Sequence, residues 1–516
     1  MNQPHLTGTP VLVVGAGIMG AGIAQVAAQA GHRVFLHDAR AGAAVEAKAK
    51  LGQSLEALVA KGKWTAAQRE QVLTRIEPVA EFADGASAGL VVEAIVESLE
   101  AKRSLFLALE AVVGEHCVLA TNTSSISVTA IANGLKRPER LVGMHFFNPV
   151  ALMKLVEVVS GLQTDAAVAG AVFDLAGAWG KVPVHARSTP GFIVNRIARP
   201  YYAETLALLL ERAAAPQVLD ACLRGAGFRM GPCELIDLIG HDTNFAVTQS
   251  VYDANFQDKR FVPSLVQREM VDGGLYGRKS GRGFYRYPLG APPLDERAYA
   301  APAPGRRRVV FGAGPAADLL AARVAALAGT AGVERAEAGG WVGLAVDEAR
   351  LVMSDGRCAA EVAAASGVSD LVLFDRIVAA DPAAGMALAT SAAPACSEAW
   401  RAQALSWLAA LGFAPQPMAD APGLVVTRTL AMLVNEAADA VLQGVCTPDG
   451  ADAAMKLGVN YPAGPFEWLA AWSAAGVVGV LEALDAHYRG ERYRVSPWLR
   501  RAAAATAASP AGDRAA

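Results

Sequence analysis

Polar side chains gather at three points in the stretch 121–157, between runs of apolar residues. Segment 121–126 (TNTSSI) carries a set of hydroxyls that includes Ser124, His145 follows an apolar run, and Glu157 lies twelve residues further on. Oxidising an alcohol requires a base that takes the hydroxyl proton while hydride leaves the carbon. Histidine, whose ordinary pKa is about 6.5, can do this at neutral pH. A neighbouring carboxylate would orient and stabilise the imidazolium, so these residue types suit alcohol oxidation.

The elements that must position these residues alternate short apolar runs with longer helical stretches from Pro10 to about Val150. The apolar runs are Val11–Val14, Val34–Leu36, Leu90–Ala94, Val118–Ala120 and Leu141–Met144. This alternation is typical of a parallel sheet covered by helices. Because ligands bind outside the carboxyl ends of the strands in such a sheet, we expect the three polar clusters to border one crevice.

A dinucleotide site is predicted at the first strand. Gly15, Gly17 and Gly20 form a GxGxxG sequence directly after Val11–Val14, and the next strand leads to Asp38. The glycines permit a tight turn, the approach of a pyrophosphate and close helix packing, while the carboxylate suits a ribose 2′-hydroxyl. This combination favours NAD over NADP. The alternative is a glycine-rich turn that binds nothing.

A second glycine-rich loop, 312–317 (GAGPAA), follows another apolar run. Ala317 stands where the third glycine belongs, and Pro315 constrains the loop. We therefore interpret this loop as part of a degenerate nucleotide-binding fold without cofactor.

The helical part of the chain is duplicated. Segment 190–196 (PGFIVNR) is echoed by 422–428 (PGLVVTR), and 231–235 (GPCEL) by 464–468 (GPFEW). The predicted organisation is an NAD-binding Rossmann-type α/β domain (1–189), a first helical domain (190–289), a linker (290–305), a degenerate Rossmann-like domain (306–421), a second helical copy (422–500) and a disordered tail (501–516).

The charge and residue composition of the chain narrow the classes of molecule that it is expected to bind. The chain has 46 Lys and Arg against 49 Asp and Glu, a net charge of −3, which suits neither nucleic acid nor an anionic membrane. No segment offers the ~18 consecutive apolar residues of a membrane span, and no signal peptide is evident. A cytoplasmic protein is expected. Six dispersed cysteines predict neither a metal site nor disulfides: Cys117, Cys222, Cys233, Cys358, Cys396 and Cys446.

These motifs resemble those of the 3-hydroxyacyl-CoA dehydrogenases. The shared sequences are GxGxxGxGIA from Gly15, TNTSSIS from Thr121, GxHFFNPxxxMKLVEV from Gly143 and PGFIVNR from Pro190. The resemblance runs from Pro10 to about Tyr287 and resumes from Pro422 to Leu499. It implies NAD-dependent oxidation of an (S)-3-hydroxyacyl-CoA thioester to the 3-oxoacyl-CoA.

The same resemblance assigns roles to four residues. His145 is the implied base, Glu157 the acid paired with it, Ser124 a hydroxyl that contacts substrate and cofactor, and Asn195 an amide that reaches the site. Taken alone, His145 could be a satisfied core histidine, Ser124 a turn residue and Asn195 a helix cap. The motifs favour the catalytic interpretation.

The resemblance also implies binding residues. Glu97, Lys102 and Asn148 are expected to line the nicotinamide half of the cofactor, and Ser54 with Lys61 to meet the coenzyme A moiety. Lys61 could equally belong to a solvated helix face.

The second helical copy departs from the pattern, because Thr427 replaces Asn195 and no nearby residue matches His145 or Glu157. We expect it to be catalytically silent and to cover the first copy within one chain, as a partner subunit would; a homodimer remains an alternative.

The sequence defines the length of the substrate's acyl chain less closely than it defines the reaction. The two-copy layout and the sequence at Lys259–Gln267 resemble family members that act on 3-hydroxyadipyl-CoA in phenylacetate catabolism, and 3-hydroxybutyryl-CoA of short-chain fatty acid or butanoate metabolism is the alternative. Arg199, one helical turn after Asn195, could pair with a distal carboxylate of the substrate, or could be a surface arginine at a helix end. A binding-only relative and a structural subunit are the rival classes; both would leave the catalytic set idle.

Overall fold

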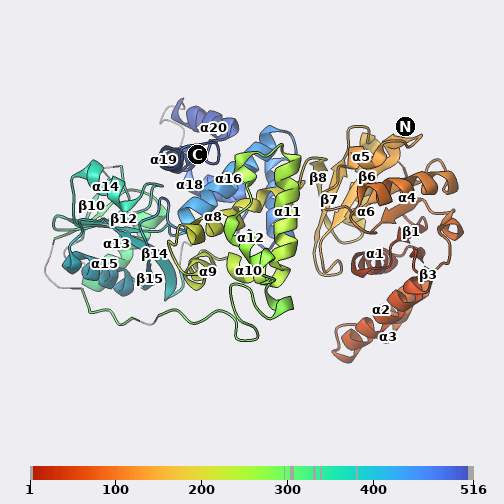
Figure 1. Ribbon diagram of the computed structural model, residues 1–516, viewed down its shortest axis with the longest axis horizontal. Helices are drawn as coiled ribbons and strands as arrows, with labels where there is room; N and C mark the ends of the chain where they lie inside the picture. The colour runs from red at the N-terminus through yellow and green to blue at the C-terminus, as the bar shows by residue number, and fades with distance from the viewer. Residues whose placement is uncertain are drawn as a thin grey trace, which may run out of the picture. The chain divides into compact units, whose positions relative to one another are not determined.

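The computed structural model describes residues 4–295, 297–302, 307–328, 333–337, 340–378 and 382–508. The chain divides into two compact units, each with its own sheet (Figure 1). The first unit comprises Met1–Arg196 and Ala440–Val459, and the second comprises Ile197–Asp439 and Asn460–Ala516.

The first unit is built on an eight-stranded sheet in the order β3-β2-β1-β4-β5-β6-β7-β8. Its strands are β1 Val11–Val14, β2 Val34–His37, β3 Ile76–Pro78, β4 Leu90–Glu93, β5 Val118–Thr121, β6 Leu141–Phe146, β7 Leu155–Ser160 and β8 Val182–Arg187. The strands from β3 to β6 are parallel, β7 is antiparallel to β6, and β8 is parallel to β7. This order matches the doubly wound fold that the sequence predicts.

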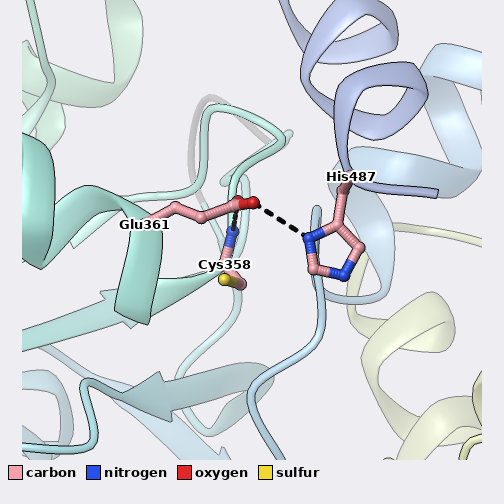
Figure 2. Close-up of side chains that lie close together, drawn as sticks. All are labelled: Cys358, Glu361 and His487. Carbon is pink, nitrogen blue, oxygen red and sulfur yellow. Dashed lines mark hydrogen bonds and ion pairs between the residues drawn. The ribbon is translucent and has the colours of Figure 1, made fainter. Parts of the chain in front are cut away.

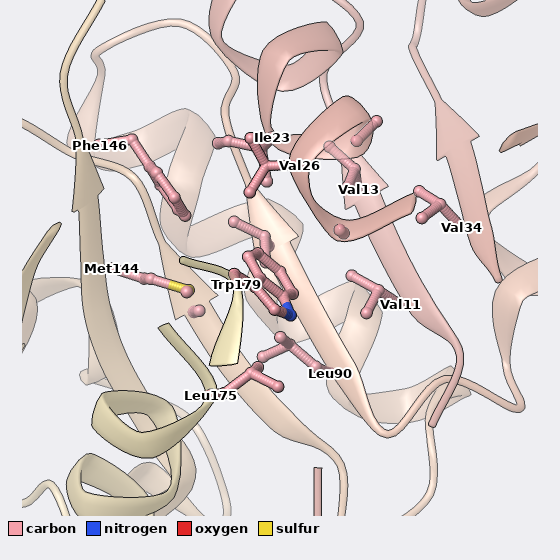
Figure 3. Packing of buried hydrophobic residues seen from close by; sticks show 14 of the residues in the cluster. Val11, Val13, Ile23, Val26, Val34, Leu90, Met144, Phe146, Leu175 and Trp179 are labelled. Atoms are coloured by element: carbon pink, nitrogen blue, oxygen red, sulfur yellow. The ribbon is translucent and has the colours of Figure 1, made fainter. Parts of the chain in front are cut away.

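Helices pack on this sheet, and its strands β1, β2, β4 and β5 are buried along their whole length. The helices of the unit are α1 Ile18–Gln29, α2 Ala43–Ala60, α3 Ala66–Arg75, α4 Leu99–Val112, α5 Val128–Ala132, α6 Ala166–Ala178 and the short α7 Val194–Ile197. One core joins the sheet to α1 and α6: Val11 and Val13 of β1 pack with Ile23 and Val26 of α1 and with Leu175 of α6 (Figure 3). This core holds the carboxyl ends of the strands in place.

Segment 440–459 belongs to the first unit although the sequence places it in the second helical copy. Its helix α17 (Pro448–Gly458) packs on β7 and β8. A Cβ added at Gly458 would lie 2.7 Å from Leu155 Cδ2, and Arg187 N donates to Val445 O at 2.9 Å. The second copy therefore supports the strand that carries Glu157.

The second unit contains a seven-stranded sheet in the order β10-β9-β11-β12-β13-β14-β15. The strands are β9 Arg308–Phe311, β10 Val333–Ala336, β11 Gly343–Val346, β12 Ala349–Met353, β13 Leu371–Phe374, β14 Met386–Ala392 and β15 Phe413–Pro417; the helices α13 Pro315–Ala328, α14 Ala359–Ser366 and α15 Glu398–Ala410 accompany them. As with β6, β7 and β8, β13 is antiparallel to β14 and β14 is parallel to β15. The degenerate Rossmann-like domain expected from the sequence is present.

The remaining helices of the second unit come from both helical copies. They are α8 Arg199–Leu210, α9 Pro216–Gly225, α10 Pro232–Ile239, α11 His241–Ala254, α12 Leu265–Asp272, α16 Val426–Leu442, α18 Pro465–Trp472, α19 Ala474–Tyr488 and α20 Pro497–Ala508. Helices α7 and α8 are separate, although the first helical domain has a helical period throughout 193–210. Pro200 at the start of α8 has no N–H for a helical bond and so favours this break.

Helix α9 of the first copy packs on β14 of the second sheet, and a Cβ added at Gly225 would lie 2.8 Å from Ala387 O. Helix α17, its counterpart in the second copy, packs in the same way on β7 of the first sheet. Each helical copy thus covers the sheet that belongs to the other copy.

A buried ion-pair network joins α8 to α16 inside the second unit. The fully buried Arg428 donates from Nε to Glu204 Oε2 at 3.0 Å, and Arg492 pairs with the other oxygen of this carboxylate at 2.8 Å. Burial alone would raise the pKa of Glu204, but Arg492 and Arg428 hold it below its ordinary value. Buried ion pairs therefore link the two helical copies, in addition to apolar packing.

Helices α14 and α19 of this unit are linked at the start of α14 (Figure 2). Glu361 Oε2 accepts a hydrogen bond from Cys358 N at 2.9 Å, and His487 Nδ1 lies 2.9 Å from Glu361 Oε1. The thiol of Cys358, the carboxylate of Glu361 and the imidazole of His487 are groups that can bind zinc, and their ligand atoms lie within 4.8 Å of one another. A capping box and an ion pair account for the arrangement.

The prediction of a disordered tail is wrong for residues 501–508, which continue α20. The tail lacks large apolar residues but is rich in alanine, the best helix former, and the buried Leu499 anchors the first turn of the helix. Residues 509–516, Arg306 and the end of the predicted linker (303–305) lie outside the described residues. Residues 292–295 and 297–302 of that linker form no helix or strand.

Among the described residues, no single helix has the length and apolar composition of a membrane span. The consecutive helices α18 and α19 meet that criterion only as a pair bent by 99°.

Candidate active site

A buried histidine–carboxylate pair lies at the end of β6. His145 and Glu157 are directly opposite each other in the antiparallel pairing of β6 with β7, and His145 Nδ1 lies 2.6 Å from Glu157 Oε2. Both side chains are buried. In the tautomer whose Nδ1 donates this hydrogen bond, Nε2 is the ring nitrogen with a lone pair that can accept a proton.

The carboxylate of Glu157 is itself fixed by backbone donors. Its Oε1 accepts hydrogen bonds from Ile193 N and Val194 N, each at 3.0 Å, at the start of α7. The N-terminus of a helix stabilises negative charge. The motif PGFIVNR therefore holds the carboxylate that is hydrogen-bonded to His145, and it also contains Asn195.

Aromatic rings enclose the imidazole. The Phe147 and Phe192 ring centroids lie 4.5 Å and 5.9 Å from that of His145. Such apolar walls lower the local dielectric and strengthen the charge interaction between His145 and Glu157.

Ser124 lies on the loop after β5, and Glu97 organises this loop. Glu97 Oε1 accepts from Ser124 N at 2.8 Å, from Ser124 Oγ at 3.2 Å and from Thr123 Oγ1 at 2.7 Å. Burial raises the pKa of Glu97, but Thr123 and Lys102, with the Ser124 amide, hold it below its ordinary value. Asn195 Nδ2 donates to Ser124 O at 3.4 Å, which brings the amide to the same loop.

Sequence analysis did not identify Glu93, the fully buried carboxylate that ends β4. Lys102 Nζ donates to Glu93 Oε1 at 2.5 Å and lies 3.3 Å from Glu97 Oε2, while Thr121 Oγ1 donates to Glu93 Oε2 at 2.6 Å. Lys102 thereby neutralises two carboxylates at the strand ends. A carboxylate closing an otherwise apolar strand, nine residues before a lysine, was the available signal.

Asn122 follows β5 and Asn148 lies just beyond β6, and the two side chains differ in burial. Asn122, which was also not predicted, accepts from Phe146 N at 2.9 Å and so links the loop after β5 to the strand that carries His145. Asn148, a predicted cofactor residue, is exposed just beyond β6.

The glycine loop fits the pyrophosphate of a dinucleotide. A Cβ at Gly15 would lie 2.4 Å from Ala94 O, and one at Gly20 would lie 1.7 Å from Gly15 O, so the backbone requires both glycines. A Cβ at Gly17 would meet nothing within 4 Å, which leaves open space for a ligand. No side chain caps α1 at Gly17, so its first amide groups can bind phosphate oxygens.

Asp38 fixes this loop. Its Oδ2 accepts from Ala16 N at 2.7 Å and its Oδ1 from Arg40 N at 2.9 Å. The carboxylate stands at the end of β2, where the adenine ribose of NAD is bound in Rossmann folds.

The structure does not bring the predicted coenzyme A residues to His145. Ser54 and Lys61 are exposed on α2 and directly after it, and Ser54 Oγ donates to Lys50 O of its own helix at 3.0 Å. Arg199 belongs to the second unit, where it is buried at the start of α8, donates to Thr248 Oγ1 at 3.1 Å and stacks over Tyr202.

The sequence predicts no counterpart of His145 in the second copy, but the strand pairing places Asp375 at the equivalent position of the second sheet. Asp375 follows β13 and is level with Ala389 of β14, as His145 is level with Glu157. Its buried carboxylate accepts from Val425 N at 2.9 Å and Val426 N at 2.6 Å, the contacts that Glu157 makes in the first copy. A single aspartate therefore stands in the position of His145 and makes the backbone contacts of Glu157, but it carries no imidazole. The motif at 422–428 did not reveal this residue, because β13 lies about fifty residues upstream.

Comparisons with known proteins identify the domains of this chain. Residues 10–189 match the NAD-binding domain of 3-hydroxyacyl-CoA dehydrogenase, and 191–287 and 423–514 match its C-terminal domain. Residues 351–422 match a 3-hydroxybutyryl-CoA dehydrogenase reduced Rossmann-fold domain.

Similar proteins include 3-hydroxyadipyl-CoA dehydrogenase of Escherichia coli K12, 44% identical over 96% of this chain and 97% of the relative. The crystal structure of 3-hydroxybutyryl-CoA dehydrogenase from Escherichia coli K12 is 41% identical with a TM-score of 0.88, over 97% of this chain and 99% of that one. The human mitochondrial hydroxyacyl-coenzyme A dehydrogenase is 40% identical over 54% of this chain and 90% of its own length.

The chain belongs to the 3-hydroxyacyl-CoA dehydrogenase family. It is an NAD-dependent oxidoreductase that converts 3-hydroxyacyl-CoA thioesters to 3-oxoacyl-CoA.

Asp38 provides a test of the cofactor site. Replacing Asp38 with Ala should raise the KM for NAD by about 10- to 100-fold, because a hydrogen bond to a charged group contributes ~1.5–3 kcal/mol. The preference for NAD over NADP should fall at the same time, since the repulsion of a 2′-phosphate is lost. Steady-state kinetics with both cofactors measure this. The Glu77→Ala variant, which removes an exposed carboxylate from the neighbouring strand β3, is the control. An unchanged cofactor preference in Asp38→Ala would contradict the assignment.

Proposed function

We propose that His145 is the general base of this dehydrogenase and that Glu157 orients it. The observation that carries the proposal is the buried His145–Glu157 pair at 2.6 Å, with the carboxylate held by two backbone amides. A core histidine needs no such arrangement, whereas a base must have a fixed tautomer and a partner for its positive charge.

In the proposed reaction, the Ser124 hydroxyl turns from Glu97 and donates its hydrogen bond to the 3-hydroxyl oxygen of the substrate, and Asn195 supports the Ser124 loop. His145 Nε2 takes the hydroxyl proton as the C3–H bond breaks, and Glu157 stabilises the imidazolium that results. NAD, when bound, accepts the hydride from C3. The products are the 3-oxoacyl thioester, NADH and a proton that leaves through His145.

The cofactor contacts beyond the glycine loop are part of the proposal. Lys102 and Glu97 lie beside the Ser124 loop, and Asn148 follows β6, so all three border the carboxyl edge of the sheet where the nicotinamide half would lie. Ser54 and Lys61 are proposed to meet the coenzyme A moiety. Their exposure on α2 is compatible with binding the phosphates of a large, mobile ligand.

We propose 3-hydroxyadipyl-CoA, an intermediate of phenylacetate catabolism, as the substrate. The support is the relative of that name, which matches this chain over nearly its whole length. The second candidate is 3-hydroxybutyryl-CoA, favoured by the name of the protein in the similar crystal structure. Arg199 is proposed to select the longer, dicarboxylic chain, because its buried guanidinium could pair with a carboxylate.

Kinetics of an Arg199→Leu variant on the two substrates test the selection. We expect kcat/KM on (S)-3-hydroxyadipyl-CoA to fall about 10- to 100-fold, since a charge-assisted hydrogen bond contributes ~1.5–3 kcal/mol, with a much smaller change on (S)-3-hydroxybutyryl-CoA. An Arg199→Lys variant, which keeps the charge, should retain part of the preference. Equal losses on both substrates would overturn the role of Arg199.

The duplicated copy is proposed to replace a partner subunit. The support is the reciprocal packing of α9 on β14 and of α17 on β7, together with the Arg428–Glu204 pair between α8 and α16. A monomer is therefore expected, and a homodimer built through the first copy alone would contradict the proposal. A cytoplasmic location is proposed as well, in keeping with six free cysteines.

A further inference from the structure

The first strands of the second sheet repeat the layout of the cofactor site. Strand β9 pairs in parallel with β10 as β1 does with β2. Gly312 N donates to Ala336 O at 2.9 Å, as Gly15 N donates to His37 O at 2.8 Å, and Gly312 has the same left-handed φ, +94° against +104°. The acidic residue after β10 is Glu337, in the place that Asp38 has after β2.

This second loop cannot bind a dinucleotide as the first does. Ala317 takes the place of Gly20, where a Cβ would lie 1.7 Å from the loop carbonyl, so the helix and the loop must be spaced differently. Pro315 also removes one amide donor from the first turn of α13. Antiparallel β11 stands beside β9 where β4 stands beside β1, and a Cβ added at Gly312 would lie 2.9 Å from Trp341 O and 2.8 Å from Val342 Cγ2.

A cleft nevertheless opens at this loop, between the second sheet and helices α18 and α19. It consists of two adjoining cavities of about 390 Å³ and 370 Å³, each within the range of small-molecule sites. The two cavities share a set of lining residues: Ala313, Val342, Met353, Arg376, Trp472 and Gly476. Trp341 lines one cavity and Trp468 the other, so planar apolar surface is abundant.

The cleft contains the cation of Arg376, which forms no salt bridge with a carboxylate among the described residues, although the adjacent Asp375 attracts its charge. The guanidinium of Arg376 lies over the Trp472 ring, 3.6 Å from its centroid, and its buried Nε has no hydrogen-bond partner. The adjacent Asp375 carboxylate is engaged by the amides that begin α16. Burial lowers the pKa of Arg376 to about 10, so it remains charged at neutral pH.

The acidic residues that line the cleft, Glu337 and Asp355, do not pair with Arg376. Asp355 pairs with Arg357 at 2.5 Å, and Glu337 is exposed. A buried Nε without an acceptor is unfavourable, whereas a phosphate group matches the donor geometry of a guanidinium. The first turn of α13 offers further amide donors for an anion.

We propose that this cleft binds a nucleoside monophosphate-class ligand, with its phosphate at Arg376 and the start of α13, its base against the tryptophans and its ribose toward Glu337. The site is smaller than a dinucleotide site and carries no base equivalent to His145. It is therefore a regulatory or structural ligand site and not a second catalytic centre.

Titration of the full-length protein with AMP tests this proposal. Saturating NADH first fills the cofactor site in the first unit, and AMP binding is then followed by calorimetry and by tryptophan fluorescence. We expect one AMP per chain, with quenching of the fluorescence. Arg376→Met, which keeps the apolar contact with Trp472, should weaken binding by at least about tenfold. Arg401→Met, which removes an exposed arginine of the same sheet domain, should bind AMP as the wild type does.

Absence of AMP binding to the NADH-saturated wild type would overturn the proposal, and so would equal affinities of the wild type and Arg376→Met. Inorganic phosphate is the second probe. Binding of phosphate as tight as that of AMP would contradict the nucleotide class, because it would show that the base contributes nothing. Binding is measured without turnover, so the result is independent of the catalytic assignment.

Discussion

Replacing His145 with Ala is expected to lower kcat by about 10²- to 10⁴-fold while the affinity for NADH stays close to that of the wild type. The variant loses the only imidazole that the described structure pairs with Glu157, but it leaves the glycine loop and Asp38 in place. Steady-state NADH formation and NADH fluorescence titration measure the two quantities separately. A similar loss of kcat and of NADH affinity would indicate structural damage instead of a missing base.

The chain supplies a matched control at the equivalent place of the second sheet. Asp375→Asn alters the residue that stands where His145 stands in the first sheet, and it keeps an oxygen that can accept from Val425 N and Val426 N. We expect this variant to retain most of the wild-type kcat. A loss of turnover comparable to that of His145→Ala would contradict a silent second copy.

The Arg428→Met variant is expected to have the largest effect on stability. Arg428 is fully buried, its Nε donates to Glu204, and its two Nη atoms donate to Tyr488 and Tyr493. The variant removes one of the two arginines that pair with Glu204 and the donor to both tyrosine hydroxyls. Breaking a buried pair costs about 3–5 kcal/mol, which corresponds to a fall of roughly 10 °C in the unfolding temperature of a unit of this size. Thermal unfolding followed by circular dichroism measures the shift.

The exposed pair between Arg500 and Glu482 is the reference for that experiment. Arg500→Ala removes an ion pair of 2.7 Å whose side chains are more than half exposed, so the cost should stay within about 1 kcal/mol. If Arg428→Met destabilised the protein no more than Arg500→Ala, the buried network would not be what fastens the two helical copies.

Local patterns predicted the parts of the fold that depend on local physics. The apolar runs before Gly15 and His145 became β1 and β6, because a strand buried on both faces must be apolar throughout. The order glycine loop, helix, strand and Asp38 is short enough in sequence to be recognised directly, and the structure contains it. The family comparison supports the reaction class that these motifs indicated.

Features that depend on which strands and segments become neighbours in the fold were not predicted. Glu93 meets Lys102 and Thr121 only because β4 and β5 are neighbours in the sheet. Segment 440–459 packs on β7, about 290 residues earlier in the chain, and Asp375 acquires its position from the pairing of β13 with β14. The tail was mispredicted because low hydrophobicity was weighed more heavily than the helix propensity of alanine.

NADH formation at 340 nm should be measured with wild-type protein, NAD and either (S)-3-hydroxyadipyl-CoA or (S)-3-hydroxybutyryl-CoA. We expect turnover of both thioesters with a higher kcat/KM on the adipyl substrate. Preference for the butyryl substrate would overturn the proposed substrate but not the chemistry, while the absence of NADH formation with either would show that the His145 site does not oxidise 3-hydroxyacyl thioesters.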